Sequence, residues 1–193
     1  LIMRYSGLIS LFLVLFFALS GCSSLKEGVW LHSTQYATGG IPSVFNHSKE
    51  ITLFDFILTR RDDSIEGTVV IKSDSNTSKR VVMTSFFGMT FLDFELNGST
   101  IKINYCIEQL NREKVILLLK KDFEILFNPD HSPITKYVFE SNGNIAALEQ
   151  GNGITRTLMR FGKYSEGYPE EVLITHPWLK IKLKLTKSKS DEN

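Results

Sequence analysis

The hydrophobic and polar positions of this chain alternate most clearly near its C-terminal end. Leu179, Ile181, Leu183 and Leu185 take every second position, and lysines or a threonine stand between them. Because successive side chains of a β-strand point to opposite faces of a sheet, this pattern predicts a strand with one buried and one solvated face.

Short segments of the same kind recur from residue 51 onward, rich in β-branched and aromatic residues and separated by turn residues. We predict further strands at Ile51–Thr59, Ile65–Lys72, Arg80–Ser85, Thr90–Leu96, Ile134–Glu140, Ile145–Glu149, Ile154–Phe161 and Glu171–Thr175. After Thr90–Leu96 comes Asn97-Gly98, a strong hairpin signal. A return strand would continue the apolar face at Ile101, Ile103 and Tyr105.

The segment Glu108–Phe127 has a different period. Its apolar residues recur at helical spacing, with charged residues around the rest of the helix: Val115, Leu118, Leu119, Phe123 and Leu126. The stretch Val115–Leu119 alone would also fit a strand. One amphipathic helix among many short strands predicts a mainly β (α+β) fold, in which a curved antiparallel sheet holds the helix against its concave face.

The N-terminal region has the features of an export signal. Arg4 is followed by an apolar run from Leu8 to Ala18, which is too short to span a bilayer. Leu19-Ser20-Gly21-Cys22 then resembles the lipobox of bacterial lipoproteins at every position, whereas an ordinary secretory signal that happens to contain a cysteine is the alternative. We expect a signal peptide over residues 1–21, palmitate and diacylglyceryl on Cys22, and a tether over residues 22–50. The domain would follow over residues 51–187, with a polar tail at 188–193.

Charge and cysteine content narrow the possible partners. The chain has 22 Lys and Arg against 21 Asp and Glu, and loss of Arg4 with the signal peptide would leave no net charge. This balance gives no support for nucleic-acid binding. Once Cys22 carries lipid, Cys106 has no disulfide partner, and we interpret it as a small buried apolar residue or a reactive thiol.

No convincing catalytic constellation is present. The four histidines, at positions 32, 47, 131 and 176, do not stand at metal-ligand spacing with another His, Cys or carboxylate. Nucleophile-elbow, phosphate-loop and HExxH motifs are missing as well. We therefore expect no enzyme activity, no metal and no cofactor, and we interpret His176, next to Pro177 at a predicted turn, as solvated.

The most informative feature is an apolar stretch where a polar loop is expected. Phe86-Phe87-Gly88-Met89 lies between two predicted strands, and Gly88 permits a tight turn. The aromatic rings either fold back as a lid on the core, or form an exposed tip in which Phe86, Phe87 and Met89 contact lipid or a partner.

The segment from Arg80 to Thr90 and the alternating Phe91–Leu96 resemble the strand–loop–strand of LolB, the outer-membrane receptor that takes lipoproteins from the carrier LolA. The end of the chain is also similar, with Tyr168-Pro169, a short strand, a turn and Ile181–Leu185. Order and spacing agree from about residue 51 to 186, as a pattern of apolar positions and turns. The lead-in before residue 51 lacks the glutamine-rich helix of LolB itself, and uncharacterised LolB-like lipoproteins share the pattern.

The resemblance implies an unclosed antiparallel β half-barrel with an apolar cavity for acyl chains. Phe87 takes the place of the protruding residue that helps LolB to insert its cargo. The apolar faces of the strand and helix would line the cavity: Leu92, Phe94, Leu96, Val115, Leu119 and Phe123. The expected location is the periplasmic side of the outer membrane, through lipid on Cys22, with acylated cargo or an envelope protein as partner. A structural or assembly accessory, which uses the same fold to bind protein, is the alternative.

Overall fold

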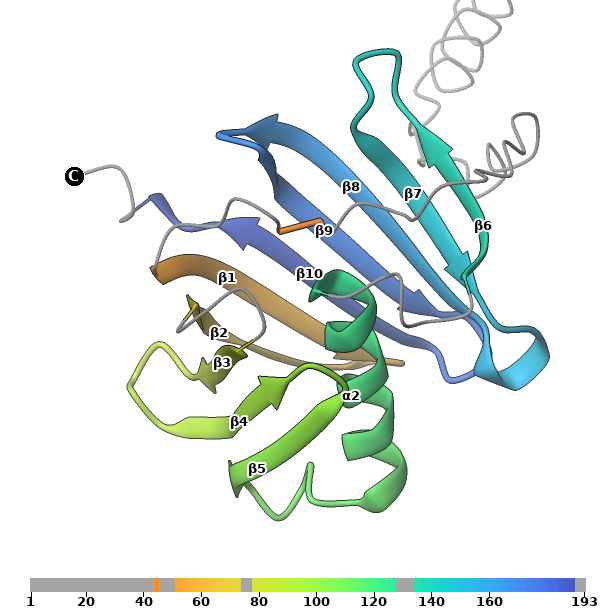
Figure 1. The fold of residues 1–193 in the computed structure, drawn as a ribbon. Coiled ribbons are helices and arrows are strands. Elements are labelled where there is room, and N and C mark those ends of the chain that lie inside the picture. The colour runs from red at the N-terminus through yellow and green to blue at the C-terminus, as the bar shows by residue number, and fades with distance from the viewer. Residues whose placement is uncertain (1–43, 46–50, 74–77, 128–133, 190–193) are drawn as a thin grey trace, which may run out of the picture. The chain divides into compact units, whose positions relative to one another are not determined.

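The computed structural model describes residues 44–45, 51–73, 78–127 and 134–189 of the chain (Figure 1). This part contains ten strands, one α-helix and a short 3-10 turn. The elements in chain order are β1 (Ile51–Arg60), β2 (Asp63–Ser73), β3 (Ser78–Thr84), β4 (Thr90–Asn97), β5 (Thr100–Cys106), α2 (Glu113–Phe127), β6 (Ile134–Phe139), β7 (Ile145–Gln150), η2 (Gly153–Thr155), β8 (Thr157–Ser165), β9 (Tyr168–His176) and β10 (Ile181–Lys187).

All ten strands belong to one open sheet in which every neighbouring pair is antiparallel. The order across the sheet is β5-β4-β3-β2-β1-β10-β9-β8-β7-β6. Helix α2 lies between β5 and β6 in the chain and so connects the two edge strands. The sheet curves around the helix (Figure 1), as accumulated strand twist favours. The mainly β fold with an amphipathic helix on an antiparallel sheet is confirmed.

Strand registers follow the sequence pattern closely. On β10, Leu183 and Leu185 are buried whereas Lys182 and Lys184 are exposed. On β4, the three predicted apolar residues are buried and the acidic residues between them are half-buried. Neighbouring β1 pairs Phe56 with Leu185. One face of the sheet therefore supplies a continuous core.

The helix is shorter than the predicted Glu108–Phe127. Residues 107–112 form turns instead, and the helix starts where the Arg112 carbonyl accepts hydrogen bonds from the amides of Val115 and Ile116. Helix α2 contacts both halves of the sheet. The ring centroids of Phe123 and Phe94 on β4 are 5.1 Å apart, and Asp122 forms a hydrogen bond with His176 at the end of β9.

Three sequence-based expectations need adjustment. The predicted strand Ile154–Phe161 begins only at Thr157, because Ile154 lies exposed in η2. Leu179 lies in the turn before β10, not on that strand. Val44 and Phe45, inside the segment that we interpreted as a tether, are both buried. The Phe45 ring packs 5.9 Å from Phe54 and 5.7 Å from Phe127, measured between centroids.

The helix that the structure describes is not long and apolar enough to cross a membrane.

Candidate functional site

The loop between β3 and β4 is a tight, internally bonded turn. The Ser85 amide donates to the Met89 carbonyl at 2.8 Å, and the Gly88 amide donates to the Ser85 carbonyl at 2.9 Å. The Met89 amide donates to the Ser85 hydroxyl at 3.0 Å. Gly88 has a φ of +83°, which glycine adopts without strain. The loop backbone is therefore organised by local contacts.

The loop carries apolar side chains into solvent. Phe87 is 100% exposed, Phe86 62% and Met89 57%. For Phe87 the structure shows an exposed tip, not a lid on the core. Three large exposed apolar residues within one four-residue loop form the kind of apolar cluster that marks contact surfaces.

The strands below the loop hold it in position through close packing. Gly67 on β2 is buried beneath the end of β3, and a Cβ atom at this position would lie 1.8 Å from the Thr84 carbonyl oxygen. Strand β3 can approach β2 this closely only because residue 67 has no side chain. The register shifts between Met83 and Thr84, where a bulge leads into the loop.

A polar ladder on the other face ties the hairpin together. The Arg80 guanidinium on β3 donates two hydrogen bonds to Asp93 on β4, at 3.0 and 2.7 Å. The Asn104 amide on β5 donates to Asp93 and Glu95. Hydrogen bonding from Arg80 lowers the pKa of the Asp93 carboxyl, so the bidentate pair stays charged at neutral pH. The loop thus extends from a braced three-stranded unit.

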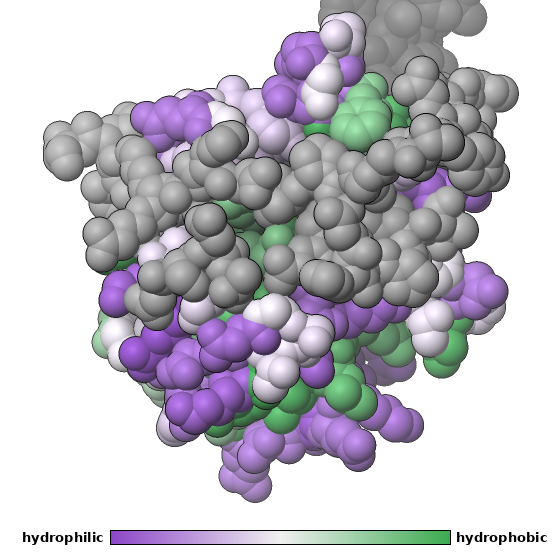
Figure 2. All heavy atoms as spheres, in the orientation of Figure 1, coloured by the Kyte–Doolittle hydropathy of each residue, from purple (hydrophilic) through white to green (hydrophobic). Residues whose placement is uncertain are grey.

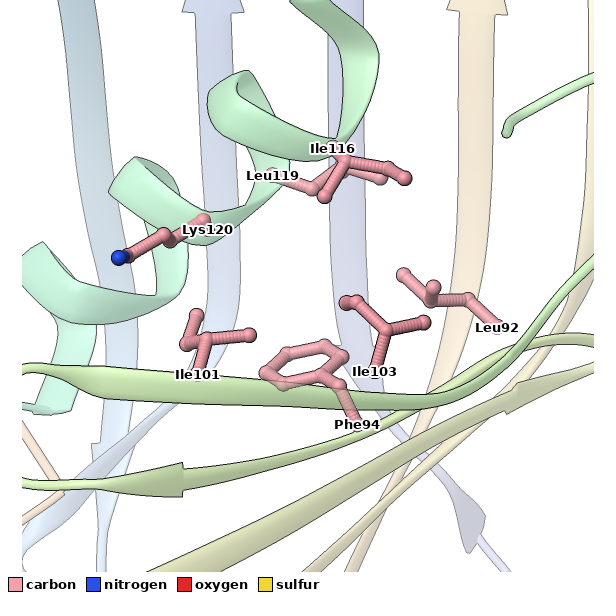
Figure 3. Close-up of a pocket in the computed structure, with 7 residues that line it drawn as sticks. All are labelled: Leu92, Phe94, Ile101, Ile103, Ile116, Leu119 and Lys120. Carbon is pink, nitrogen blue, oxygen red and sulfur yellow. The ribbon is translucent and has the colours of Figure 1, made fainter. Parts of the chain in front are cut away.

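An apolar pocket lies between α2 and the β4–β5 hairpin (Figure 3). Its volume is about 10 Å³, room for about one water molecule. Six apolar residues and one lysine line it: Leu92, Phe94, Ile101, Ile103, Ile116, Leu119 and Lys120. The Lys120 Nζ atom points away from the apolar side chains (Figure 3).

The six predicted cavity residues are divided between this pocket and the core. Leu92, Phe94 and Leu119 line the pocket. Leu96 and Phe123 are fully buried, and Val115 is half-buried against the core. Figure 2 shows apolar surface in green where β5 and α2 lie side by side in Figure 1, surrounded by polar side chains in purple. Ile103, Tyr105 and Leu117 of these elements are exposed.

The expectation for His176 was wrong, because this residue is buried and 2% exposed. Its Nε2 atom lies 2.9 Å from Asp122 Oδ2, and its Nδ1 atom lies 3.3 Å from the Thr157 hydroxyl. Helix α2 covers the ring and supplies the carboxylate. The signal available in the sequence was Asp122 itself, three residues after Leu119 and four before Leu126, on the apolar face of the predicted helix.

The Asp122–His176–Thr157 arrangement has the same order of groups as a catalytic triad, but its hydroxyl is not accessible from solvent. Thr157 and Asp122 are each 1% exposed, so a substrate cannot reach the hydroxyl. Burial raises the pKa of the Asp122 carboxyl, and hydrogen bonding to His176 opposes the shift. Asp122 Oδ1 is buried without a hydrogen-bond partner. The arrangement is suited to holding α2 on the sheet.

The remaining sequence-based candidates carry less information. Cys106 is half-buried, not fully buried, and burial raises the pKa of its thiol, which disfavours the reactive thiolate. Cys22 lies outside the described residues. In the part of the chain that the structure describes, His, Cys, Asp and Glu form no group of three or more placed to hold a metal ion.

The fold defines the chain as a mainly β protein with one open antiparallel sheet around a helix. Protein-family models and curated proteins give no match to the sequence. Among solved structures, the chain is similar to a LolA superfamily protein from Nitrosomonas europaea, with 9% identity and a TM-score of 0.47. The similarity covers 76% of this chain and 88% of that chain.

Proposed function

We propose that this protein is a lipid-anchored, non-enzymatic lipoprotein on the periplasmic side of the outer membrane, which contacts acyl chains of membrane lipid or lipoprotein cargo through Phe86, Phe87 and Met89. The anchor is supported by the lipobox resemblance that ends at Cys22. The observation that carries the contact is the full exposure of Phe87 on a loop braced from both sides.

The energetics favour contact of this loop with lipid. Complete burial of a Phe side chain is worth about 1.5–3 kcal/mol. Phe87 contributes none of this to the fold, because it is fully exposed. The same free energy becomes available when the ring enters an apolar phase. The hydrogen bonds within the loop hold its backbone in place, so little backbone entropy is lost on contact.

A second candidate function is that of an assembly accessory. In this case the core of the present chain is filled by its own side chains, and its surface binds another protein. Within the part of the chain that the structure describes, the pocket under α2 favours this candidate, because its volume of about 10 Å³ is far below the ~300 Å³ of a typical small-molecule site. Both candidates use the Phe86–Met89 loop, and they differ in whether its partner carries an acyl chain.

The Phe87→Glu variant tests the contact. We expect its melting temperature to match that of the wild type, because no native packing is lost. Binding to vesicles, or transfer of an acylated peptide into them, should fall about tenfold or more, since 1.4 kcal/mol corresponds to tenfold. Leu117→Glu is the matched control, because Leu117 is also an exposed apolar residue but lies on α2. Equal losses in both variants would remove the special role of the loop.

Native mass spectrometry of the detergent-extracted protein separates the two candidates. A lipid or acylated peptide that co-purifies with the wild type and is lost in Phe87→Glu supports the acyl-chain function. Co-purification of an unacylated protein through the same loop supports the accessory function.

A further inference from the structure

A second exposed aromatic residue lies away from the Phe86–Met89 loop. Trp178 is 70% exposed in the turn between β9 and β10, next to the exposed Leu179. Figure 1 shows this turn and the β3–β4 loop on opposite sides of the view. The indole ring is not part of the hydrophobic core, and it does not belong to the Phe86–Met89 loop or to the pocket under α2.

The strand pairing brings cations to Trp178. The Arg61 amide in the β1–β2 turn donates to the Lys180 carbonyl at 3.1 Å, which joins the two turns. Arg60 stands opposite Ile181 in the β1–β10 ladder. Arg60, Arg61, Trp178 and Lys180, called the basic corner below, are all exposed. Two exposed acidic residues, Asp62 in the β1–β2 turn and Asp63 at the start of β2, partly balance the charge of the basic corner.

Each of the two turns of the basic corner has a cation in a left-handed backbone conformation. Arg61 has a φ of +56° and Lys180 a φ of +53°, in the left-handed region that side chains disfavour. Several other tight turns place glycine in this region: Gly88, Gly98, Gly143 and Gly167. The two joined turns instead hold a long cation at each strained position. Lys163 and Glu166, at the end of β8 and in the turn after it, have the same backbone conformation. What distinguishes the corner is that its two left-handed residues are both exposed cations on joined turns, one of which carries the exposed Trp178.

We propose that the basic corner binds the headgroup region of an anionic lipid bilayer. Tryptophan is enriched at the membrane–water interface, because its indole combines a large apolar ring with one N–H donor. The guanidinium and ammonium groups carried by the same joined turns match lipid phosphates. This surface is separate from the Phe86–Met89 loop, and it does not depend on the function proposed for that loop.

Fluorescence quenching by brominated lipid tests the proposal on the full chain. The chain has two tryptophans, so Trp30→Phe leaves Trp178 as the reporter. The protein is reconstituted into vesicles of phosphatidylcholine alone, or of equal parts of phosphatidylcholine and phosphatidylglycerol, each with brominated acyl chains. Only protein that sediments with the vesicles is measured. We expect Trp178 to be quenched more strongly in the anionic vesicles, and less so at high salt.

Glycine variants separate charge from backbone geometry. Arg61→Gly and Lys180→Gly keep or relieve the left-handed turn, so the melting temperature should hold or rise. Each variant should lower the ratio of membrane-bound to unbound basic corner by about fivefold. A cation near an anionic lipid surface contributes about 1 kcal/mol to binding, which corresponds to this factor. Lys163→Gly is the matched control, because Lys163 also has a left-handed φ, of +52°, but lies on β8 near the opposite ends of the strands. It should leave the quenching unchanged.

Equal quenching in both vesicle types, or no quenching, would overturn the proposal. The proposal would also be overturned if Trp178 were quenched as strongly in the Arg61→Gly and Lys180→Gly variants as in the wild type. Phe87→Glu should leave Trp178 quenched, because the two surfaces are separate. Failure of the Phe86–Met89 proposal therefore leaves this result intact, whereas loss of Trp178 quenching in Phe87→Glu would contradict a corner that acts on its own.

Discussion

The hydrogen bond between Asp122 and His176 should hold helix α2 on the sheet, and Asp122→Ala tests this. Both side chains are 2% exposed, and the Nε2–Oδ2 distance is 2.9 Å. Alanine leaves the imidazole buried without its carboxylate. Loss of one partner of a buried hydrogen bond costs about 1–3 kcal/mol, and more when a charged group is involved. We expect Asp122→Ala to lower the free energy of unfolding by about 3 kcal/mol.

The pH dependence of stability gives this prediction a definite sign. Burial raises the pKa of Asp122 in the folded protein, so the folded state binds more protons than the unfolded state above the ordinary value of about 3.9. The contribution of Asp122 is therefore most favourable in acid and declines as pH rises through the raised pKa. Asparagine does not titrate, and its amide can still form a hydrogen bond with Nε2, because it carries both a donor and an acceptor. Asp122→Asn should thus gain stability relative to the wild type as pH rises.

Urea denaturation followed by circular dichroism, from about pH 4 to about pH 8, measures both effects. Glu124→Ala is the control on the same helix. Glu124 forms an i,i+4 ion pair with Lys120 near the surface, which is worth about 0.5 kcal/mol or less. The reasoning about the buried pair would be refuted if Asp122→Ala lowered the free energy of unfolding no more than Glu124→Ala does. It would also be refuted if the stability of Asp122→Asn relative to the wild type fell as pH rose.

Three further predictions address the core, the hairpin and the anchor. Leu183→Ala should cost about 2–5 kcal/mol and the exposed Lys184→Ala less than about 0.5 kcal/mol in urea denaturation; equal costs would contradict the register of β10. Gly67→Ala should cost about 1–3 kcal/mol, because the new Cβ atom meets the Thr84 carbonyl. Gly162→Ala, whose Cβ would come no closer than 3.9 Å to Glu171, should cost little; similar melting temperatures for these two variants would count against close packing at Gly67. Cys22→Ser should abolish palmitate labelling in cells, and unchanged labelling would exclude the lipobox interpretation.

Much of the sheet could be predicted because its signals are local. Alternation with a period of two fixes which side of β4 and β10 is buried, and a glycine turn fixes the β4–β5 hairpin. The exposed Phe87 was one of two open alternatives. The choice between them depends on how far the loop extends from its strands, and this follows from Gly67 beneath β3 and from the hydrogen bonds of Ser85.

The features that the sequence did not reveal depend on contacts between distant segments. His176 is buried because Asp122, 54 residues earlier, arrives on α2. Phe45 joins the core from a polar segment by packing on Phe54 and Tyr168. Arg61 and Lys180 meet only through the pairing of β1 with β10. The pocket volume likewise depends on how side chains of α2, β4 and β5 pack together, which periodicity does not specify.

Photo-crosslinking from position 87 tests the proposed contact most directly. Phe87 is replaced by p-benzoylphenylalanine, which is inserted at the fully exposed position with no loss of packing. The variant is irradiated in native membranes, and Leu117 with the same replacement serves as the control. We predict adducts at position 87 whose mass shows a lipid acyl chain or an acylated peptide, and few such adducts at position 117. Adducts at position 87 only with unacylated protein, or equal lipid adducts at both positions, would contradict the proposed acyl-chain contact.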